Sequence, residues 1–183
     1  MQTNRLSKNL VDALNAQMTN EAHASQIYLS FASWAERQGF SGIANFLFRH
    51  AQEERNHMMK ILEYILKRGA VVQVSAIKAP PENPSAIYDC FEKIFIHEVA
   101  NTKEIYKLVK MSMEEEDWAT FNFTQWFVKE QIEEETLAMN LVAKMKLAGG
   151  EKISKEVLFA IDKEMTTALD EVVSAEDVTA VNP

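Results

Sequence analysis

Hydrophobic residues recur in steps of three and four along most of the chain, which is the spacing of residues on one face of an α-helix. This pattern predicts four long helices, over residues 7–38, 42–68, 85–113 and 118–148. A shorter stretch with the same spacing predicts a fifth helix over residues 155–170. The tail at 171–183 has little to bury and is predicted to be disordered. The length of 183 residues predicts a single all-α domain over residues 1–183.

Polar residues and glycines mark the predicted helix ends. Ser7, Ser41 and Asp117 directly precede periodic stretches and are predicted to cap the first, second and fourth helices. Gly39 and Gly42 are predicted to bracket a short turn between the first two helices. A connection that short makes these two helices antiparallel neighbours.

The connection between the second and third helices is long and rich in proline. A helix is excluded between residues 70 and 85 by Pro80, Pro81 and Pro84. The same segment is predicted to lie extended on the protein because of Val71, Val72, Val74 and Ile77. Fifteen extended residues reach at most about 50 Å, whereas a 27-residue helix is about 40 Å long. The predicted fold is therefore a four-helix bundle with one long crossover, rather than an up-down-up-down bundle.

Composition narrows the function classes. The 183 residues are 47% hydrophobic with only five Gly and four Pro, which suits a mostly helical globular protein. Because the net charge is −8 and no apolar run could cross a bilayer, we expect neither nucleic acid nor a membrane as a partner. The first residues lack the apolar core of a signal peptide, which predicts a cytoplasmic location. The single Cys90 excludes an intramolecular disulfide and a cysteine-based zinc site.

Each long helix loses its apolar stripe near its middle, always to Glu or to Glu with His. The interrupting residues are Glu21, Glu54 with His57, Glu98, and Glu130 with Glu134. If all the stripes face one core, five carboxylates meet there, and the stripes contain no Lys or Arg to compensate their charge. Because buried unpaired carboxylates are strongly destabilising, metal cations are the remaining source of positive charge. An oxygen-rich ligand set with one histidine suits two iron ions better than zinc, which more often takes Cys or several His.

Four other residues have less specific interpretations. His23, His50 and His97 are interpreted as surface or edge residues rather than as ligands. Tyr28 lies two helical turns after Glu21 on the same face. The pattern leaves two roles open for Tyr28, either a core tyrosine with its hydroxyl satisfied or a hydrogen-bond donor and redox partner of the metal site.

The chain carries five motifs, Asn20-Glu21, His50-Ala51-Gln52-Glu53-Glu54 followed by His57, His97-Glu98, Phe121-Asn122-Phe123 with Gln125-Trp126, and Glu130-Gln131 with Glu133-Glu134-Glu135. With these motifs, residues 7–170 resemble the bacterial non-haem ferritins, a ferritin-like di-iron family. The resemblance implies a ferritin-like bundle with a ferroxidase centre. Its first iron would be bound by Glu21, Glu54 and His57. Its second iron would be bound by Glu54, Glu98 and Glu134.

The same resemblance implies further roles. Gln131 and Tyr28 match positions that support the iron ligands. Glu53, Glu130 and Glu133 match a third, inward-lying iron site of the bacterial branch. The family assembles as a hollow homo-oligomeric shell of twenty-four subunits, which stores ferric mineral.

Two departures from related families change the expectations. Arg55, and not Met, follows Glu54, and no second Glu-x-x-His motif is present, because Glu133 follows Glu130 at that spacing. We therefore expect no haem. Phe121 and Thr124 stand where animal ferritins line their threefold channels with carboxylates, so the iron entry route is not predicted.

The expected function is iron storage, with Fe(II) oxidised to Fe(III) by O2 or H2O2 at the paired site. Two alternatives stay open. The first is a rubrerythrin-like di-iron peroxidase, although that family usually carries a cysteine-rich module. The second is a shell that sequesters cations without turnover.

Overall fold

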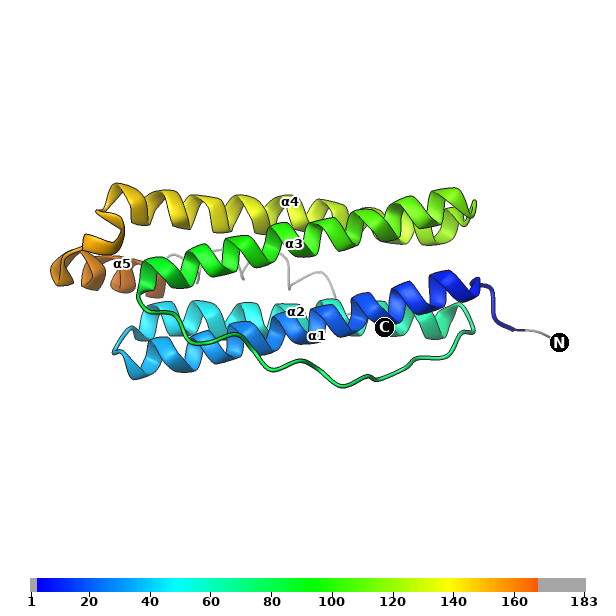
Figure 1. Cartoon of the computed structure of the whole chain (residues 1–183), viewed down its shortest axis with the longest axis horizontal. Helices are drawn as coiled ribbons and strands as arrows, with labels where there is room; N and C mark the ends of the chain where they lie inside the picture. Colours follow the sequence, from blue (N-terminus) through cyan, green and yellow to red (C-terminus); the bar gives the residue numbers. More distant parts are fainter. Residues whose placement is uncertain (1–2, 168–183) are drawn as a thin grey trace.

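The computed structural model describes residues 3–167 and consists of four long helices with a short helix packed at one end (Figure 1). The long helices are α1 (Lys8–Arg37), α2 (Ser41–Lys67), α3 (Ile87–Glu114) and α4 (Trp118–Leu147). A 3-10 turn at Gly150–Lys152 leads into α5 (Lys155–Thr167). Residues 3–167 contain no strand, which confirms the all-α bundle. The predicted helix end at 168–170 and the tail at 171–183 lie outside the described residues.

Two of the predicted caps are confirmed. The Ser7 hydroxyl accepts a hydrogen bond from the Leu10 backbone N–H at 3.1 Å. The Asp117 carboxylate accepts one from the Thr120 N–H at 2.9 Å. Each cap satisfies a backbone donor that has no partner within its own helix, and this fixes where α1 and α4 begin.

The crossover runs along α1 from one end of the bundle to the other, so that α3 runs parallel to α2 (Figure 1). The side chain of Asn15 on α1 binds the backbone of the crossover. It donates to the Val71 carbonyl at 3.2 Å and accepts from the Gln73 N–H at 2.6 Å. Val71 and Val74 are 77% and 83% exposed. The predicted extended path is correct. Its physical cause here is backbone hydrogen bonding, because these two valines face outward.

The start of α2 differs from the prediction. Ser41 is the first helical residue and not the cap, because Phe40 occupies the cap position without a side-chain hydrogen bond. Gly42 lies inside the first turn of α2, where a Cβ would come within 1.9 Å of the Asp162 carbonyl oxygen on α5. The Ile43 N–H also donates to the Asp162 carboxylate at 2.9 Å. Gly42 is therefore a contact residue that allows α5 to approach α2, and not a turn residue.

Replacing Gly42 with alanine should destabilise the docking of α5 by about 1–3 kcal/mol, since the added methyl group overlaps the α5 backbone. Hydrogen exchange should show faster exchange in α5 and in the first turn of α2. Ser41→Ala is the matched control, because Ser41 is exposed and adjacent in the helix. Protection of α5 equal to wild type in Gly42→Ala would contradict the contact.

The hydrophobic core is divided into two clusters along the bundle. One cluster includes Phe31, Leu47 and Phe91, and the other includes Leu14 and Ile61. Along each long helix one buried glutamate falls between these clusters, joined on α2 by His57. The two apolar clusters thus support a polar layer at the middle of the bundle, where the predicted ligands lie.

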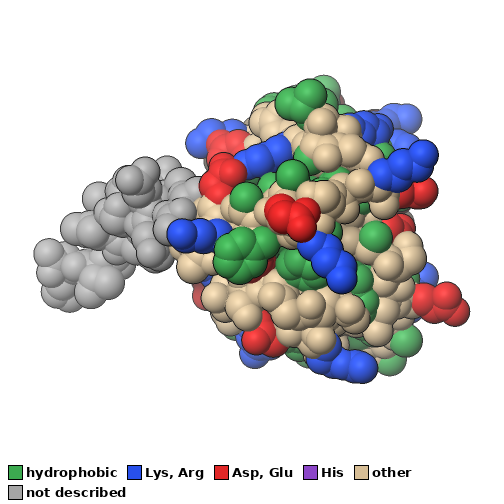
Figure 2. Space-filling model, turned by 90° about the vertical axis from the view of Figure 1, so that its left-hand side faces the viewer, with side chains coloured by type: hydrophobic (Ala, Val, Ile, Leu, Met, Phe, Trp, Pro, Cys, Tyr) green, Lys and Arg blue, Asp and Glu red, His purple; other side chains and the backbone are tan. Residues whose placement is uncertain are grey.

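The surface carries charges of both signs. Figure 2 shows the end that bears α5, where Lys and Arg side chains are scattered among acidic and hydrophobic ones. None of the helices in the described part of the chain combines the length and the apolar character needed to cross a bilayer.

Candidate metal centre

Four carboxylates from four helices are buried in the middle layer. Glu21 on α1, Glu54 on α2, Glu98 on α3 and Glu134 on α4 have exposures of 1%, 2%, 0% and 6%. His57 joins them with an exposure of 4%. Ligand atoms of Glu21, Glu54 and His57 all lie within 4.8 Å of one another, close enough to share one metal ion. The interrupted stripes of the sequence therefore do converge on one place.

The buried face of α4 differs from the predicted one. Glu130 was expected in the core, but it is only half-buried, and its neighbour Gln131 is 2% exposed. Adjacent residues on a helix are rotated by about 100°, so the core face of α4 is shifted by one residue over this stretch. The core consequently holds four fully buried carboxylates rather than five, with Glu130 at the edge of the layer.

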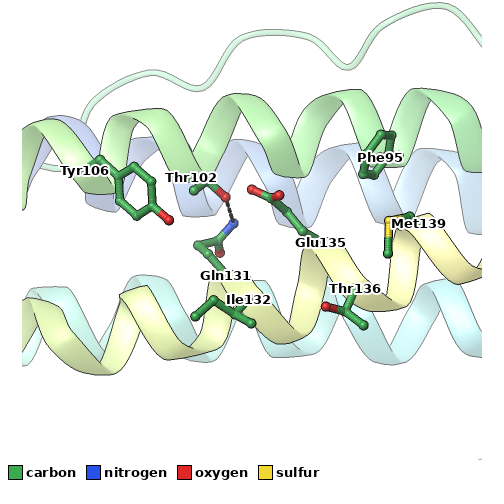
Figure 3. Close-up of a pocket in the computed structure, with 8 residues that line it drawn as sticks. All are labelled: Phe95, Thr102, Tyr106, Gln131, Ile132, Glu135, Thr136 and Met139. Carbon is green, nitrogen blue, oxygen red and sulfur yellow. Dashed lines mark hydrogen bonds between the residues drawn. The ribbon is translucent and has the colours of Figure 1, made fainter.

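Glu98 is held by hydrogen bonds from two sides. The Tyr28 hydroxyl donates to one carboxylate oxygen at 2.7 Å. The Gln131 amide donates to the other oxygen at 3.4 Å and to the Thr102 hydroxyl at 3.2 Å. Figure 3 shows Gln131 reaching from α4 to Thr102 on α3 at a groove of about 200 Å³ between these helices. Tyr28 is thus both a buried core residue and a hydrogen-bond donor to a predicted metal ligand.

Glu21 is held by two amides that the sequence did not mark as functional. The Gln17 amide donates to one Glu21 oxygen at 2.6 Å and to the side-chain oxygen Oδ1 of Asn101 at 2.7 Å. Asn101 donates to the other Glu21 oxygen at 3.4 Å. Gln17 is a polar residue one turn before Glu21 on the same stripe, and that was the available signal. Asn101, one turn after Glu98, becomes recognisable only when α1 and α3 are packed together.

Glu54 is the carboxylate without a complete set of partners. Its Oε2 atom is buried and has no hydrogen-bond partner within residues 3–167. His57 Nδ1 lies 3.4 Å from this atom without forming a hydrogen bond. A buried carboxylate oxygen with no donor is costly. Its position next to an imidazole nitrogen and the Glu21 carboxylate matches the donor set of a metal site.

A second group of ligand atoms adjoins the first. His50 Nδ1 lies 3.3 Å from a Glu53 oxygen and 3.9 Å from a Glu134 oxygen. Glu53, His57 and Glu130 also bring ligand atoms within 4.8 Å of one another. The interpretation of His50 as a surface or edge residue is wrong, because its exposure is only 8%. The signal was its place in the apolar stripe one turn before Glu54.

Glu133 lies outside these close groups. It is exposed, and its carboxylate is 3.4 Å from the Lys129 ammonium. It still acts on the cluster electrostatically, because burial, Glu53 and Glu133 together raise the pKa of Glu130. Of the three residues assigned to a third iron site, Glu53 and Glu130 are therefore close together and Glu133 is at the periphery.

Comparison with known proteins agrees with this geometry. The family model described as Ferritin-like domain matches residues 11–148. A bacterial non-heme ferritin of Campylobacter jejuni is 41% identical over 144 residues, covering 79% of this chain and 86% of that protein. A probable bacterial non-heme ferritin-like protein of Haemophilus influenzae is 39% identical over 160 residues, covering 87% and 95%. This chain belongs to the ferritin family.

A solved structure shares the fold of this ferritin. The open pore ferritin of the archaeon Archaeoglobus fulgidus superposes with a TM-score of 0.85 at 38% identity, covering 91% of this chain and 99% of that one.

In the absence of cations, the surroundings of the metal centre in this ferritin disfavour the ionised form of its carboxyl groups. Burial, then the neighbouring carboxylates, raise the pKa of Glu54 well above its usual value. Burial, followed by Glu98, raises the pKa of Glu134 to about 9. Burial also raises the pKa of Glu98 to about 7, although its hydrogen bonds with Tyr28 and Gln131 lower it. Burial lowers the pKa of His57, which keeps its imidazole neutral and able to bind a metal. Divalent cations would replace the protons that these groups otherwise retain.

Proposed function

We propose that this ferritin stores iron and that each subunit is a ferroxidase, which oxidises Fe(II) with O2 or H2O2. The observation that carries the proposal is the buried carboxylate layer with the unpartnered oxygen of Glu54. Iron is the substrate and cargo, and no haem is proposed. The cytoplasmic location stays a prediction from the sequence.

The proposed ligand roles are those that the family resemblance implies, and the positions of the side chains support them. Glu21, Glu54 and His57 would bind the first Fe(II), since their ligand atoms lie within 4.8 Å of one another. Glu98 and Glu134 would bind the second, with Glu54 shared between the two ions. The four carboxylates then balance the charge of two divalent ions, so the loaded layer is neutral.

Oxidation changes this balance. Each Fe(II) loses one electron, and the two electrons together reduce O2 to peroxide, or H2O2 with two protons to water. The ferric pair leaves two uncompensated positive charges among the same carboxylates. This favours movement of the product towards Glu53 and Glu130, which lie next to the centre. Tyr28 and Gln131 would keep the Glu98 carboxylate oriented during these steps.

The test is the absorbance change during aerobic addition of Fe(II) to the assembled wild-type protein. A fast ferric phase that saturates near two iron ions per subunit is expected for the ferroxidase. Oxidation no faster than in buffer would favour the sequestering shell. Rapid reaction with peroxide alone, without retention of ferric mineral, would favour the rubrerythrin-like peroxidase.

Assembly gives a further prediction. Large apolar side chains are exposed on a single chain, including Leu147 at 92% and Phe159 at 70%, and copies of the chain would cover them. Light scattering should give a mass of about 500 kDa, twenty-four times the 20.9 kDa subunit. A stable monomer or dimer at micromolar concentration would contradict the storage shell.

The Glu130→Ala variant should test the third site. We expect the fast first oxidation to stay within about twofold of wild type, because Glu130 lies at the edge of the centre. Later turnovers should slow and the iron-to-oxygen stoichiometry should change, because the ferric product loses a neighbouring acceptor. Multi-turnover kinetics and an oxygen electrode measure both.

The matched control is Glu133→Ala on the same helix. Because Glu133 is exposed and paired with Lys129, its loss should have the smaller effect. If Glu130→Ala matches wild type in its later turnovers and in its bound iron, Glu53 and Glu130 act only as surface charges and form no third iron site.

A further inference from the structure

A second pair of histidines lies between α1 and α3, on the other side of Asn101 from Glu21. His23 and His97 line a pocket of about 310 Å³. Its lining comprises Asn20, His23, His97, Ala100, Asn101 and Glu104. Asn20 and His23 are three apart on α1, and Ala100, Asn101 and Glu104 follow His97 by three, four and seven on α3, so each helix presents one face to the pocket. Neither histidine belongs to the metal centre described above.

The inner ring nitrogens of this pair lack protein partners. Nε2 of His23 and Nε2 of His97 are both buried, and neither has a hydrogen-bond partner among the described residues 3–167. Both histidines lie at the edge of the bundle, as the sequence predicted, but these nitrogens point away from bulk solvent. A buried polar nitrogen without a partner is unfavourable. Two such atoms on neighbouring histidines beside one pocket point to a ligand that both imidazoles bind.

The chemistry of the pocket selects a cation. Glu104 adds a carboxylate to the lining, and no Lys or Arg lines the pocket. Lys107 pairs with Glu104 at 2.7 Å outside it. Imidazole nitrogens are preferred ligands of divalent first-row metals such as zinc, copper and nickel. The pocket therefore differs from the carboxylate-rich centre in the type of metal that it favours.

The geometry of the two rings is close to that of a shared metal ion. Their centroids are 6.4 Å apart, with the rings edge to face. Zinc–nitrogen bonds of about 2.0–2.1 Å at a tetrahedral angle place the centroids of two ligating imidazoles roughly 5 Å apart. A closing movement of about 1 Å, within reach of side-chain rotation, would bring the two rings to this separation.

We propose that His23 and His97 together bind one divalent late first-row transition-metal ion, such as Zn²⁺ or Co²⁺, with water completing its coordination. The site is separate from the ferroxidase centre, since Asn101 lies between the pocket and Glu21. It does not depend on the proposed oxidation of Fe(II).

The test measures Zn²⁺ bound at equilibrium to the metal-depleted, assembled protein. His23→Phe should bind one Zn²⁺ per subunit fewer than wild type, while its initial rate of Fe(II) oxidation stays within about twofold of wild type. Asn20→Ala is the matched control, because Asn20 lines the same pocket without an imidazole, and it should keep the wild-type count. Loss of oxidation in every protein, with the Zn²⁺ difference intact, would overturn the ferroxidase proposal alone.

Anomalous diffraction from Zn²⁺-soaked wild-type crystals provides the second measurement and does not depend on any variant. A peak within bonding distance of both Nε2 atoms is expected. Equal Zn²⁺ counts in wild type and His23→Phe would overturn the site. A map with no peak between the rings, or with a peak bound to one histidine only, would also overturn it.

Discussion

Replacing Glu54 with alanine should slow the rapid oxidation of Fe(II) by at least about 100-fold, more than the loss of a residue that only supports a ligand usually costs. Glu54 is the carboxylate proposed to bind both iron ions, and its buried Oε2 has no partner within the described residues. The fold should survive, because the two apolar clusters that flank the layer stay intact. Stopped-flow absorbance measures the rate, and circular dichroism measures the helix content.

Glu63→Ala is the matched control for this variant. Glu63 lies on the same helix, but it is exposed and paired with Lys67. Its replacement should leave the oxidation rate within about twofold of wild type, as expected for a surface ion pair. A Glu54→Ala protein that oxidises the first iron ions at the wild-type rate would rule out the proposed pair.

The metal-depleted protein should lose stability as the pH rises from about 6.5 to 8.5. The pKa of Glu134 is about 9 in the folded chain, far above that of an unfolded glutamate. Within this window the folded state therefore holds a proton that the unfolded state has released. The stabilisation is complete below the unfolded pKa and is lost as the pH rises through the folded pKa. A carboxyl group with such a raised pKa lowers the free energy of unfolding by about 1.4 kcal/mol per pH unit, or by about 3 kcal/mol between pH 6.5 and 8.5.

Other groups with shifted pKa values affect stability outside this pH range, either in the opposite direction or at higher pH. The lowered pKa values of His57 and His97 act below pH 6.5, where they make stability rise with pH. Burial raises the pKa of the Cys90 thiol to about 12. This thiol lowers the stability only above about pH 8.5, where an unfolded thiol loses its proton. Unfolding in denaturant at a fixed protein concentration measures the free energy, since assembly makes stability depend on concentration.

Two variants make this expectation specific. Glu134→Gln should flatten the dependence on pH, because the amide does not titrate. Glu133→Gln is the control, since the adjacent carboxylate is exposed and paired with Lys129. Divalent cations should stabilise the wild type more at pH 8.5 than at pH 6.5, because they compete with protons for the same oxygens. Equal stability of the metal-depleted wild type at both pH values would show that these carboxylates are not held protonated.

Much of this protein follows from the sequence because it depends on local geometry. Helical spacing alone placed Glu21, Glu54, His57 and Glu98 on apolar stripes, and all four are buried. A helix has one period, so a polar residue in register with apolar ones faces the same core. The length and prolines of the segment after α2 likewise limited the topology to one long crossover. These features needed no knowledge of how the helices pack.

Other features were decided only when the helices came together. On α4, apolar residues lie on more than one side, so a face through Glu130 and a face through Gln131 fitted the pattern equally well. Packing against α3, where Gln131 reaches Glu98 and Thr102, selected the second. In the same way, α5 gave Gly42 its role, and the proximity of α2 to α4 brought His50 to Glu134. Each of these depends on contacts between residues far apart in the chain, which the period of a single helix does not encode.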